Sequence, residues 1–514
     1  MTSEGPYRIV ILGGGTAGWM CAAGLAGLLA AIDYDITLIE SDEIGTVGVG
    51  EATLPHIKSF NDMLGIDEAE FMRATRGTIK LGIEFVDWLR PGARYIHPFG
   101  TFGDRWASAD FQHHWARARL AGTDGRSLQD YSFAVAAARA NSFEHPNTDP
   151  KSIRSTYSYA YHFDAGLYAV FLRTWATARG IRRMEGKVVD VARHAQNGEV
   201  ERLILASGAE VAGDLFIDCS GFRSLLLGQT MGVPWLDWSA WLPCDRALAV
   251  PCESARPLTP YTRATAQRGG WTWRIPLQHR IGNGHVFSSA FCGEEEARRT
   301  LLGGLDGEAL DEPRLLRFQT GRRAAGWKSN VVALGLASGF LEPLESTSIF
   351  LIQAATTDLA GLVPRRGAGV DPRMIREFNR LFEIHHDRIR DFLVLHYSAN
   401  ERVGEPLWDH VRTMPLPDSL AHKLALFRES AVAPDYKLGL FSRDSWLSAL
   451  EGQGVLPSAA SPLTHRLPAA DLQARLDDLA MRIAVNAADM TPHAEFIAGY
   501  CAAGSAVRPA ASAA

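Results

Sequence analysis

Three glycines near the amino terminus have the spacing of a turn that binds a dinucleotide. Gly13, Gly15 and Gly18 lie in the run GGGTAG, which follows an apolar stretch and precedes a segment rich in alanine. The first glycine of such a turn allows a tight bend, the second lets backbone N–H groups approach a pyrophosphate, and the third lets helix and strand pack closely. Glu40 ends the next apolar stretch, about 20 residues further on, where a carboxylate accepts hydrogen bonds from ribose hydroxyls. Together these residues predict a bound dinucleotide.

Two later segments indicate that the dinucleotide is FAD. The stretch AGDLFIDCSG contains Asp218 at the end of an apolar run, and SNVVALGLASGF contains Gly335 and Leu336 in a glycine-rich turn. They resemble the second nucleotide-proximal segment and the flavin-side segment of FAD-dependent monooxygenases. Because the chain has no second GxGxxG run within a βαβ pattern, we expect no nicotinamide site. Reduced FAD would then come from a separate NAD(P)H-dependent flavin reductase.

Four further segments indicate which flavin-dependent reaction the protein catalyses. They are GVGEATLP at 48–55, GTIKLGIEF at 77–85, WTWRIP at 271–276 and FLEPLESTS at 340–348. The WxWxIP pattern separates flavin-dependent halogenases from the flavin monooxygenases that they otherwise resemble. Taken with the other three segments, it makes the sequence resemble the tryptophan-halogenase family over most of its length.

The resemblance implies an enzyme that uses reduced FAD, O2 and halide to form hypohalous acid and then halogenates an aromatic substrate by electrophilic substitution. Lys80 matches the family's catalytic lysine, which receives the hypohalous acid as a hydrogen-bond donor or through a haloamine. The apolar neighbours Ile79 and Leu81 favour a buried position for this lysine. Glu345 matches the catalytic glutamate, which orients the halogenating species and removes the proton from the cationic ring. We interpret Glu342, three residues earlier, as structural.

The same resemblance bears on the substrate and the halide. Family members that act on free tryptophan carry adjacent tyrosines and a glutamate where this chain has Ser445 and Trp446, so we expect an uncharged indole or a phenol-like aromatic. Ser348 replaces a glycine that is common in the family and could alter the anion pocket. Bromide is more weakly hydrated and more easily oxidised than chloride, so we expect it to be used at least as well. The residues expected at substrate or halide are His97, Phe99, Ser346, Thr347, Ser348 and Trp446.

A longer set of residues is expected at the cofactor. These residues are Gly13, Gly15, Thr16, Ala17, Gly18, Glu40, Gly50, Glu51, Ala52, Val189, Asp218, Gly335 and Leu336. No histidines and cysteines have metal-ligand spacing, so we expect no metal. Two other functions stay open. A flavin-dependent aromatic hydroxylase would form a product that does not depend on halide, and a flavin-binding protein without catalysis would form no halogenated product.

An α/β fold must position these residues. We expect an FAD-binding Rossmann-like domain of the flavin monooxygenase type at residues 1–385, a mainly helical substrate-side region at 386–503 and a disordered tail at 504–514. The net charge of −6 gives no reason to expect binding to nucleic acid or an anionic membrane. Six widely spaced cysteines favour no disulfide framework, and the start of the chain lacks the pattern of a signal peptide, so we expect a cytoplasmic protein. A homodimer is compatible with the sequence.

Overall fold

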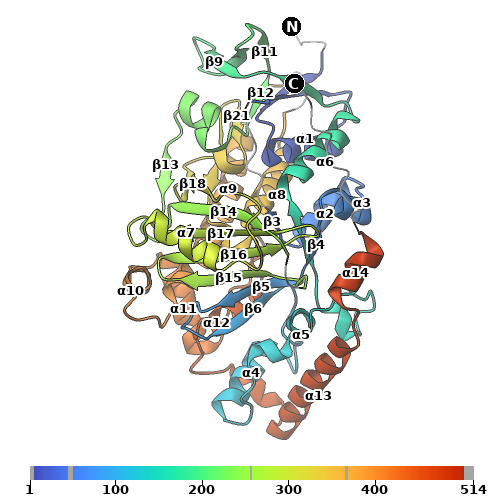
Figure 1. Ribbon diagram of the computed structural model, residues 1–514, viewed down its shortest axis with the longest axis vertical. Coiled ribbons are helices and arrows are strands. Elements are labelled where there is room, and N and C mark those ends of the chain that lie inside the picture. The colour runs from blue at the N-terminus through green and yellow to red at the C-terminus, as the bar shows by residue number, and fades with distance from the viewer. Residues whose placement is uncertain (1–4, 44–49, 255–256, 365–367, 503–514) are drawn as a thin grey trace.

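The structure, a computed structural model, describes residues 5–43, 50–254, 257–364 and 368–502 (Figure 1). The tail expected at 504–514 and the first two residues of the segment 48–55 lie outside the described residues. Within the described ranges, no helix is long and apolar enough to cross a membrane.

A mostly parallel sheet forms the nucleotide-binding core. β1 (Tyr7–Leu12) leads through the glycine turn into α1 (Thr16–Leu28), and β2 (Tyr34–Glu40) returns beside β1. β12 (Leu215–Asp218) pairs with the other side of β1, so that Ile9 lies opposite both Ile36 and Leu215. The sheet order is β20-β21-β12-β1-β2-β8, with β8 at Arg182–Glu185, β20 at Trp327–Lys328 and β21 at Val331–Ala333. The Rossmann-like α/β prediction is confirmed.

A second, mostly antiparallel sheet carries the segments expected to direct the reaction. Its order is β18-β14-β17-β16-β15-β5-β6. The WTWRIP segment lies in the centre as β16 (Gly270–Pro276), and His97 lies on the edge strand β6 (Arg94–Pro98). The other strands are β5 (Gly82–Val86), β14 (Arg246–Cys252), β15 (Thr262–Gln267), β17 (Ile281–Phe287) and β18 (Arg314–Arg317).

A small sheet brings Glu51 and Lys80 onto neighbouring elements. β7 (Ala160–Asp164) lies between β3 (Gly50–Ala52) and β4 (Thr78–Lys80) and is antiparallel to both. Lys80 is the last residue of β4, and the chain then enters β5 of the larger sheet. The lysine therefore lies where the two sheets meet.

Helices from the second half of the chain cover the site. α8 (Thr347–Ala360) starts two residues after Glu345 and packs against α1, and α9 (Pro372–Ser398) contacts both α8 and α12 (Arg443–Gly452). α9 runs unbroken through residue 386, so the boundary expected there falls inside one helix. Apolar residues on both sides of this point belong to one core. The helical region is therefore continuous with the rest of the molecule at that position.

The remaining elements surround these layers, and α13 and α14 run along one side of the molecule (Figure 1). The remaining helices are α2 (His56–Met63), α3 (Glu68–Ala74), α4 (Phe111–Leu120), α5 (Phe133–Arg139), α6 (Ala165–Thr177), α7 (Glu294–Gly303), α10 (Pro406–Thr413), α11 (Asp418–Ser430), α13 (Ala469–Ala488) and α14 (His493–Tyr500). The remaining strands are β9 (Val188–Arg193), β10 (Val200–Leu205), β11 (Glu210–Ala212), β13 (Trp235–Asp237), β19 (Gly321–Arg323) and β22 (Gly339–Phe340).

Candidate active site

The glycine turn packs too closely to admit side chains. Gly13 has a φ of +116°, and a Cβ there would lie 2.3 Å from the carbonyl oxygen of Cys219. A Cβ on Gly18 would lie 1.8 Å from the Gly13 carbonyl oxygen, and one on Gly14 would lie 1.6 Å from the Glu40 carboxylate. α1 begins without a capping side chain, so its first backbone N–H groups are available to a phosphate. The turn has the form required to hold a pyrophosphate.

Glu40 lies beside this turn and is held by its own partners. Its Oε2 accepts a hydrogen bond from Trp19 Nε1 at 3.1 Å, and its Oε1 accepts one from Arg183 Nε. Arg173 Nη1 lies 3.7 Å from Oε1. These contacts fix the carboxylate where a ribose hydroxyl could reach it.

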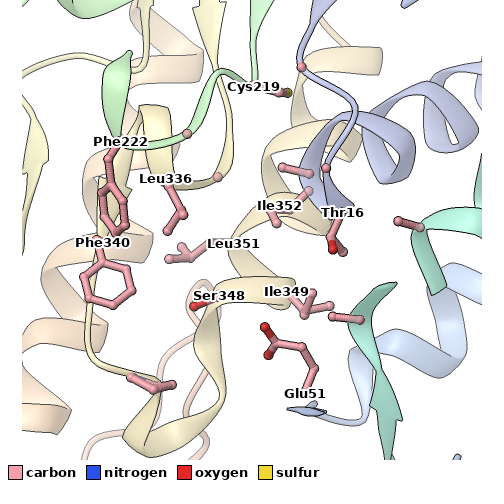
Figure 2. Close-up of a pocket in the computed structure, with 18 of the residues that line it drawn as sticks. Thr16, Glu51, Cys219, Phe222, Leu336, Phe340, Ser348, Ile349, Leu351 and Ile352 are labelled. Carbon is pink, nitrogen blue, oxygen red and sulfur yellow. The ribbon is translucent and has the colours of Figure 1, made fainter. Parts of the chain in front are cut away.

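A cavity of about 650 Å³ extends from the glycine turn to β16 and the start of α8 (Figure 2). We call it the flavin cavity. In Figure 2, Thr16 and Leu336 face each other across it, and the Glu51 carboxylate points into it beside Ile349. The expected cofactor residues that line it are Gly13, Gly15, Thr16, Ala17, Glu40, Gly50, Glu51, Ala52, Gly335 and Leu336. Gly18 contributes through close packing of the turn.

Besides Gly18, two residues expected at the cofactor do not line the flavin cavity. Val189 on β9 is 60% exposed, and Val188 lines the cavity in its place, because successive side chains of a strand point to opposite faces. Asp218 is fully buried and accepts hydrogen bonds from the backbone N–H groups of Leu226 and Leu227, each at 2.8 Å. Asp218 therefore organises the chain after β12 and does not line the flavin cavity.

Apolar residues that no sequence motif indicated line one wall of the flavin cavity. Phe340 packs on Phe222 at 5.4 Å and on Phe318 at 4.7 Å between ring centroids, and Ile349 and Leu351 come from α8. Phe222 is 47% exposed and lines the flavin cavity. Phe222 follows directly after the segment CSG at 219–221, and this is the sequence feature that could have indicated its position at the cavity.

Lys80 is fully buried beside this cavity. Its Nζ donates hydrogen bonds to the Thr53 carbonyl oxygen at 2.9 Å and to Ser346 Oγ at 2.8 Å. Burial lowers the pKa of Lys80 to about 7, although the nearby Glu345 and Glu51 carboxylates oppose this change. Burial raises the pKa of Glu51 to about 7, and Lys80 opposes that shift. A lysine in this state can act as an amine or as an ammonium donor near neutral pH.

Glu345 is also fully buried, between two histidines. Its Oε2 lies 2.8 Å from His97 Nδ1, and its Oε1 lies 3.0 Å from His396 Nε2. The second contact has the distance of an ion pair, but its direction is not that of a hydrogen bond. Burial favours the neutral acid, yet the two histidines outweigh it and hold the pKa of Glu345 at about 2.

Glu342 lies in a separate buried network. Its Oε2 accepts hydrogen bonds from Trp271 Nε1 at 2.9 Å and from the Tyr397 hydroxyl at 2.5 Å. Burial raises the pKa of Glu342 to about 7, while these two hydrogen bonds oppose the shift. The network connects the first tryptophan of WTWRIP to α9, next to His396.

The three residues after Glu345 are arranged around the start of α8. Ser346 has a φ of +57°, and its Oγ accepts the hydrogen bond from Lys80. Ser346 and Ser348 line the flavin cavity, whereas the Thr347 side chain is buried and is absent from the cavity lining. α8 begins without a side-chain cap, which leaves backbone N–H groups that favour an anion.

A second cavity of about 510 Å³ lies beyond Lys80 and Glu345, and we call it the substrate cavity. His97 and Phe99 line it, as expected, together with Phe441 and Ser445. Trp446 does not line it. The Trp446 ring is 1% exposed and packs edge-on against Phe392 at 5.0 Å, because consecutive residues of a helix point in different directions.

Lys80 and Glu345 are absent from the lining of both cavities and lie in the wall between them. Lys80 joins Ser346, which lines the flavin cavity, to Thr53, whose neighbour Leu54 lines the substrate cavity. The Lys80 ammonium lies 5.2 Å from the centre of the Phe99 ring on the substrate side.

Known proteins are similar to this chain in sequence and in fold. A family model described as tryptophan halogenase matches residues 8–469. The tryptophan 6-halogenase of Streptomyces toxytricini is 36% identical over 490 residues, which cover 90% of this chain and 92% of that protein. A flavin-dependent halogenase from Xanthomonas campestris has a solved structure with a TM-score of 0.93 and 46% identity, covering 98% of this chain and 99% of that one. One from Brevundimonas gives 0.92 and 42%, covering 97% and 99%.

Proposed function

The chain belongs to the tryptophan halogenase family of flavin-dependent enzymes, and on this premise we propose that it halogenates an uncharged indole or a related aromatic. FAD and halide are the cofactor and co-substrate of this family. The proposal adds that reduced FAD arrives from a separate reductase, that Lys80 and Glu345 carry the chemistry, and that the substrate carries no charge.

The glycine turn and the flavin cavity fit FAD. The turn has no room for a Cβ at Gly13, Gly14 or Gly18, so its backbone can approach a pyrophosphate closely. Glu40 ends β2, the position from which a carboxylate binds the ribose hydroxyls in such folds. When bound, reduced FAD supplies the electrons and the oxygen activation that turn halide and O2 into hypohalous acid. Gly50, Glu51 and Ala52 would hold it from the strand β3.

The wall between the two cavities is the observation that carries the proposal. An aromatic substrate in the substrate cavity is separated from the flavin cavity by Lys80, Glu345 and their partners. A hydroxylase needs its substrate next to the flavin, whereas a halogenase can pass a small oxidant through the wall. Lys80 would hold that oxidant through Nζ, and bulky Trp271 and Trp273 would keep the flavin cavity closed to aromatic substrates.

The start of α8 supports binding of the halide. Its uncapped backbone N–H groups favour an anion, and Ser346 and Ser348 line the flavin cavity at this point. Bromide enters such a site with less loss of hydration than chloride. We therefore propose that bromide is used at least as well as chloride.

The lining of the substrate cavity supports an uncharged substrate. The described residues that line it include no lysine or arginine, and Asp444 is its one carboxylate. Asp444 Oδ1 accepts the backbone N–H of Phe102 at 3.1 Å, and burial raises the pKa of this carboxyl. The carboxylate of free tryptophan would find no cationic side chain here, and an unpaired buried charge costs several kcal/mol, on the order of a broken ion pair.

Product analysis tests the proposal. The protein is incubated with FAD, NADH, a flavin reductase, bromide or chloride and a panel of indoles, and the products are identified by mass spectrometry. We expect halogenated indole that depends on halide and on the reductase. A hydroxylated product that does not change with halide would indicate a hydroxylase, and FAD binding without any product would indicate a binding protein.

A further inference from the structure

Glu342 is a buried carboxylate that the proposed halogenation does not use. It is 0% exposed, and its Oε1 has no hydrogen-bond partner within the described parts of the protein. A buried carboxyl group costs stability unless it is fully paired. Its Oε2 accepts hydrogen bonds from Trp271 at 2.9 Å and from Tyr397 at 2.5 Å. One carboxylate oxygen therefore joins the two kinds of side chain that most readily lose a single electron.

Trp271 connects this network to the flavin cavity. Its ring lines the cavity and lies 6.1 Å between centroids from the ring of Trp273, which lines it as well. An electron acceptor held in the flavin cavity can therefore take an electron from these indole rings directly. Of the two tryptophans, Trp271 is the one bound to Glu342.

Trp88 lies against both Trp271 and Tyr397. The distances between ring centroids are 6.2 Å to Trp271 and 5.4 Å to Tyr397. Trp408 lies 5.3 Å from Trp88 and stacks on Tyr397 at 5.9 Å. Each of these rings is at most 1% exposed. Since neighbouring aromatic rings exchange electrons readily, Tyr397 can supply an electron to Trp271 through Trp88 without any step through water.

Tyr397 is the member of this group that can lose a proton together with an electron. Its hydroxyl donates to Glu342 Oε2, and Cys244 Sγ lies 3.4 Å from the same hydroxyl oxygen. Burial raises the pKa of Tyr397, so the intact phenol keeps its proton. Burial also raises the pKa of Glu342 to about 7, so its ionised form binds a proton more strongly than an exposed glutamate does. An oxidised tyrosine is stabilised by such an acceptor.

We propose that Trp271, Trp88, Tyr397 and Glu342 form an electron-transfer relay that carries one-electron oxidation away from the flavin cavity. The oxidant is oxidised FAD that blue light has excited. Trp271 gives it one electron, and Tyr397 replaces that electron through Trp88. The O–H bond of Tyr397 breaks in the same step, and its proton forms an O–H bond at Glu342 Oε2.

The cycle closes without consuming a reagent. When the electron returns from the flavin to Tyr397, Glu342 gives the proton back, and all residues regain their first state. The residues that line the flavin cavity thereby escape lasting oxidation. The relay goes beyond the proposed function, because it needs flavin in the cavity but neither halide, reductase nor aromatic substrate.

Flash spectroscopy tests the relay. The protein loaded with FAD, in a buffer more alkaline than the Glu342 pKa of about 7, is excited by a blue laser pulse. Transient absorption distinguishes a tryptophan radical from a neutral tyrosyl radical, and we expect the first to be followed by the second. In Tyr397→Phe the tyrosyl signal should disappear. A wild type without a tyrosyl radical, or a Tyr397→Phe protein with the wild-type tyrosyl signal, would overturn the proposal.

Glu342→Gln tests the proton acceptor. The glutamine oxygen can still accept hydrogen bonds from Trp271 and Tyr397 but cannot take up the phenol proton. The tryptophan radical should therefore form, while the tyrosyl radical is lost. In the wild type, transfer to D2O should slow the appearance of the tyrosyl radical, because an O–D bond then breaks. A wild-type tyrosyl yield in Glu342→Gln, or equal rates in the two solvents, would contradict the role of Glu342.

Tyr131→Phe is the matched control. Tyr131 also donates to a buried carboxylate, that of Asp124. Its ring packs edge-on against Phe111 at 5.1 Å, and neither residue lines the flavin cavity. The transient spectra of Tyr131→Phe should match those of the wild type, and loss of the tyrosyl signal there would show that the relay ends at a different tyrosine. FAD affinity, measured by equilibrium dialysis, shows whether each variant keeps an intact fold.

Continuous blue light in air tests the protection. The wild type and Tyr397→Phe, both loaded with FAD, are irradiated, and oxidised peptides that contain Cys219, Trp271 or Trp273 are quantified by mass spectrometry. We expect more oxidation in Tyr397→Phe, and equal oxidation would overturn the protective role. Absence of halogenated indole in the separate product assay would instead overturn the proposed function, and the radical measurements would still stand.

Discussion

Lys80 is held in a state between amine and ammonium. Burial lowers the pKa of its side chain to about 7, while Glu345 and Glu51 keep the charged form accessible. The hydrogen bonds to Thr53 and Ser346 orient Nζ within the wall. Both roles open to the lysine, as a hydrogen-bond donor to hypohalous acid and as the nitrogen of a haloamine, are therefore available near neutral pH.

Lys80→Met should abolish halogenation of indole while FAD binding and the release of hydrogen peroxide continue. Methionine fills most of the volume but has no group that can hold the oxidant. Product formation and peroxide release, measured in the same reaction with reductase, separate the two steps. Lys58→Met is the control, because Lys58 donates to the Tyr159 hydroxyl at 2.6 Å, away from the wall. Halogenation by Lys80→Met near the wild-type rate would show that the lysine has no chemical role.

The same substitution should change how stability depends on pH. An unfolded lysine has a pKa of about 10.5, and burial lowers that of Lys80 to about 7. Between these values the unfolded chain binds a proton that the fold excludes, so the wild type gains stability as the pH rises. The stability of Lys80→Met relative to wild type should therefore be highest below pH 7 and decline toward pH 10.5. Urea unfolding across this range measures it, and a constant difference would contradict the buried state of Lys80.

Glu345→Gln should lower turnover on indole by on the order of 10² or more, the scale of a lost base. Glu342→Gln should lower it much less. Burial raises the pKa of Glu342 to about 7, so glutamine resembles its neutral form and can still accept from Trp271 and Tyr397. Steady-state kinetics of the two variants under identical conditions provide the comparison. Equal losses in the two variants, with intact folds, would show that the catalytic role has been given to the wrong carboxylate.

At the level of elements, the strand β4 is held from both sides. Thr78 Oγ donates to the carbonyl oxygen of Pro276, the last residue of WTWRIP, at 2.7 Å. On the other side, the Ile79 N–H donates to His493 Nε2 at 3.3 Å, from the first residue of α14. Lys80 follows directly. The segment near the end of the chain thus takes part in positioning the lysine.

His493→Ala should destabilise the protein and reduce halogenation. Burial lowers the pKa of His493 to about 4, so the neutral ring accepts from Ile79 and donates to the Leu258 carbonyl oxygen. Losing the ring leaves both backbone groups without this partner, at about 1–3 kcal/mol each. Thermal unfolding and turnover measure the two effects. Glu495→Ala, an exposed position on the same helix, should change neither. A His493→Ala protein with the stability and turnover of the wild type would refute the link between α14 and β4.

At the scale of the whole molecule, two cavities are arranged around one wall. The flavin cavity draws on the parallel sheet, β16 and α8, and the substrate cavity draws on β6 and the segment before α12. The substrate side offers apolar rings and hydroxyls, with no lysine or arginine among the described lining residues. We therefore expect substrate choice to depend on residues that do not line the flavin cavity.

Indole should be halogenated in preference to free tryptophan when both are present at equal concentration. The zwitterion of tryptophan would lose hydration without gaining a cation for its carboxylate, whereas indole loses little. Competition assays in bromide and in chloride, followed by mass spectrometry, give the ratio of products. A clear preference for tryptophan would show that groups outside the described cavity lining bind its charges.

The amino-acid sequence by itself determined the features that depend on local chemistry. Gly13, Gly15 and Gly18 have the spacing of a dinucleotide-binding turn between a strand and a helix, and the alternation around Lys80 indicates a buried strand. The family segments extended this to Glu345 and His97. Each of these predictions rests on residues close together in the chain.

The tertiary structure alone decided which side chains meet. His396 is one of many residues on α9, and no spacing in the sequence links it to Glu345, which lies before α8. Val188 faces the flavin cavity and Val189 does not, and Ser445 faces the substrate cavity while Trp446 faces the core. Neighbouring residues of a strand or helix point to different faces, and packing against distant segments decides which face lines a cavity. For this reason the sequence predicted Lys80, Glu345 and His97 as site residues, but not His396 and not that His97 and His396 both contact Glu345.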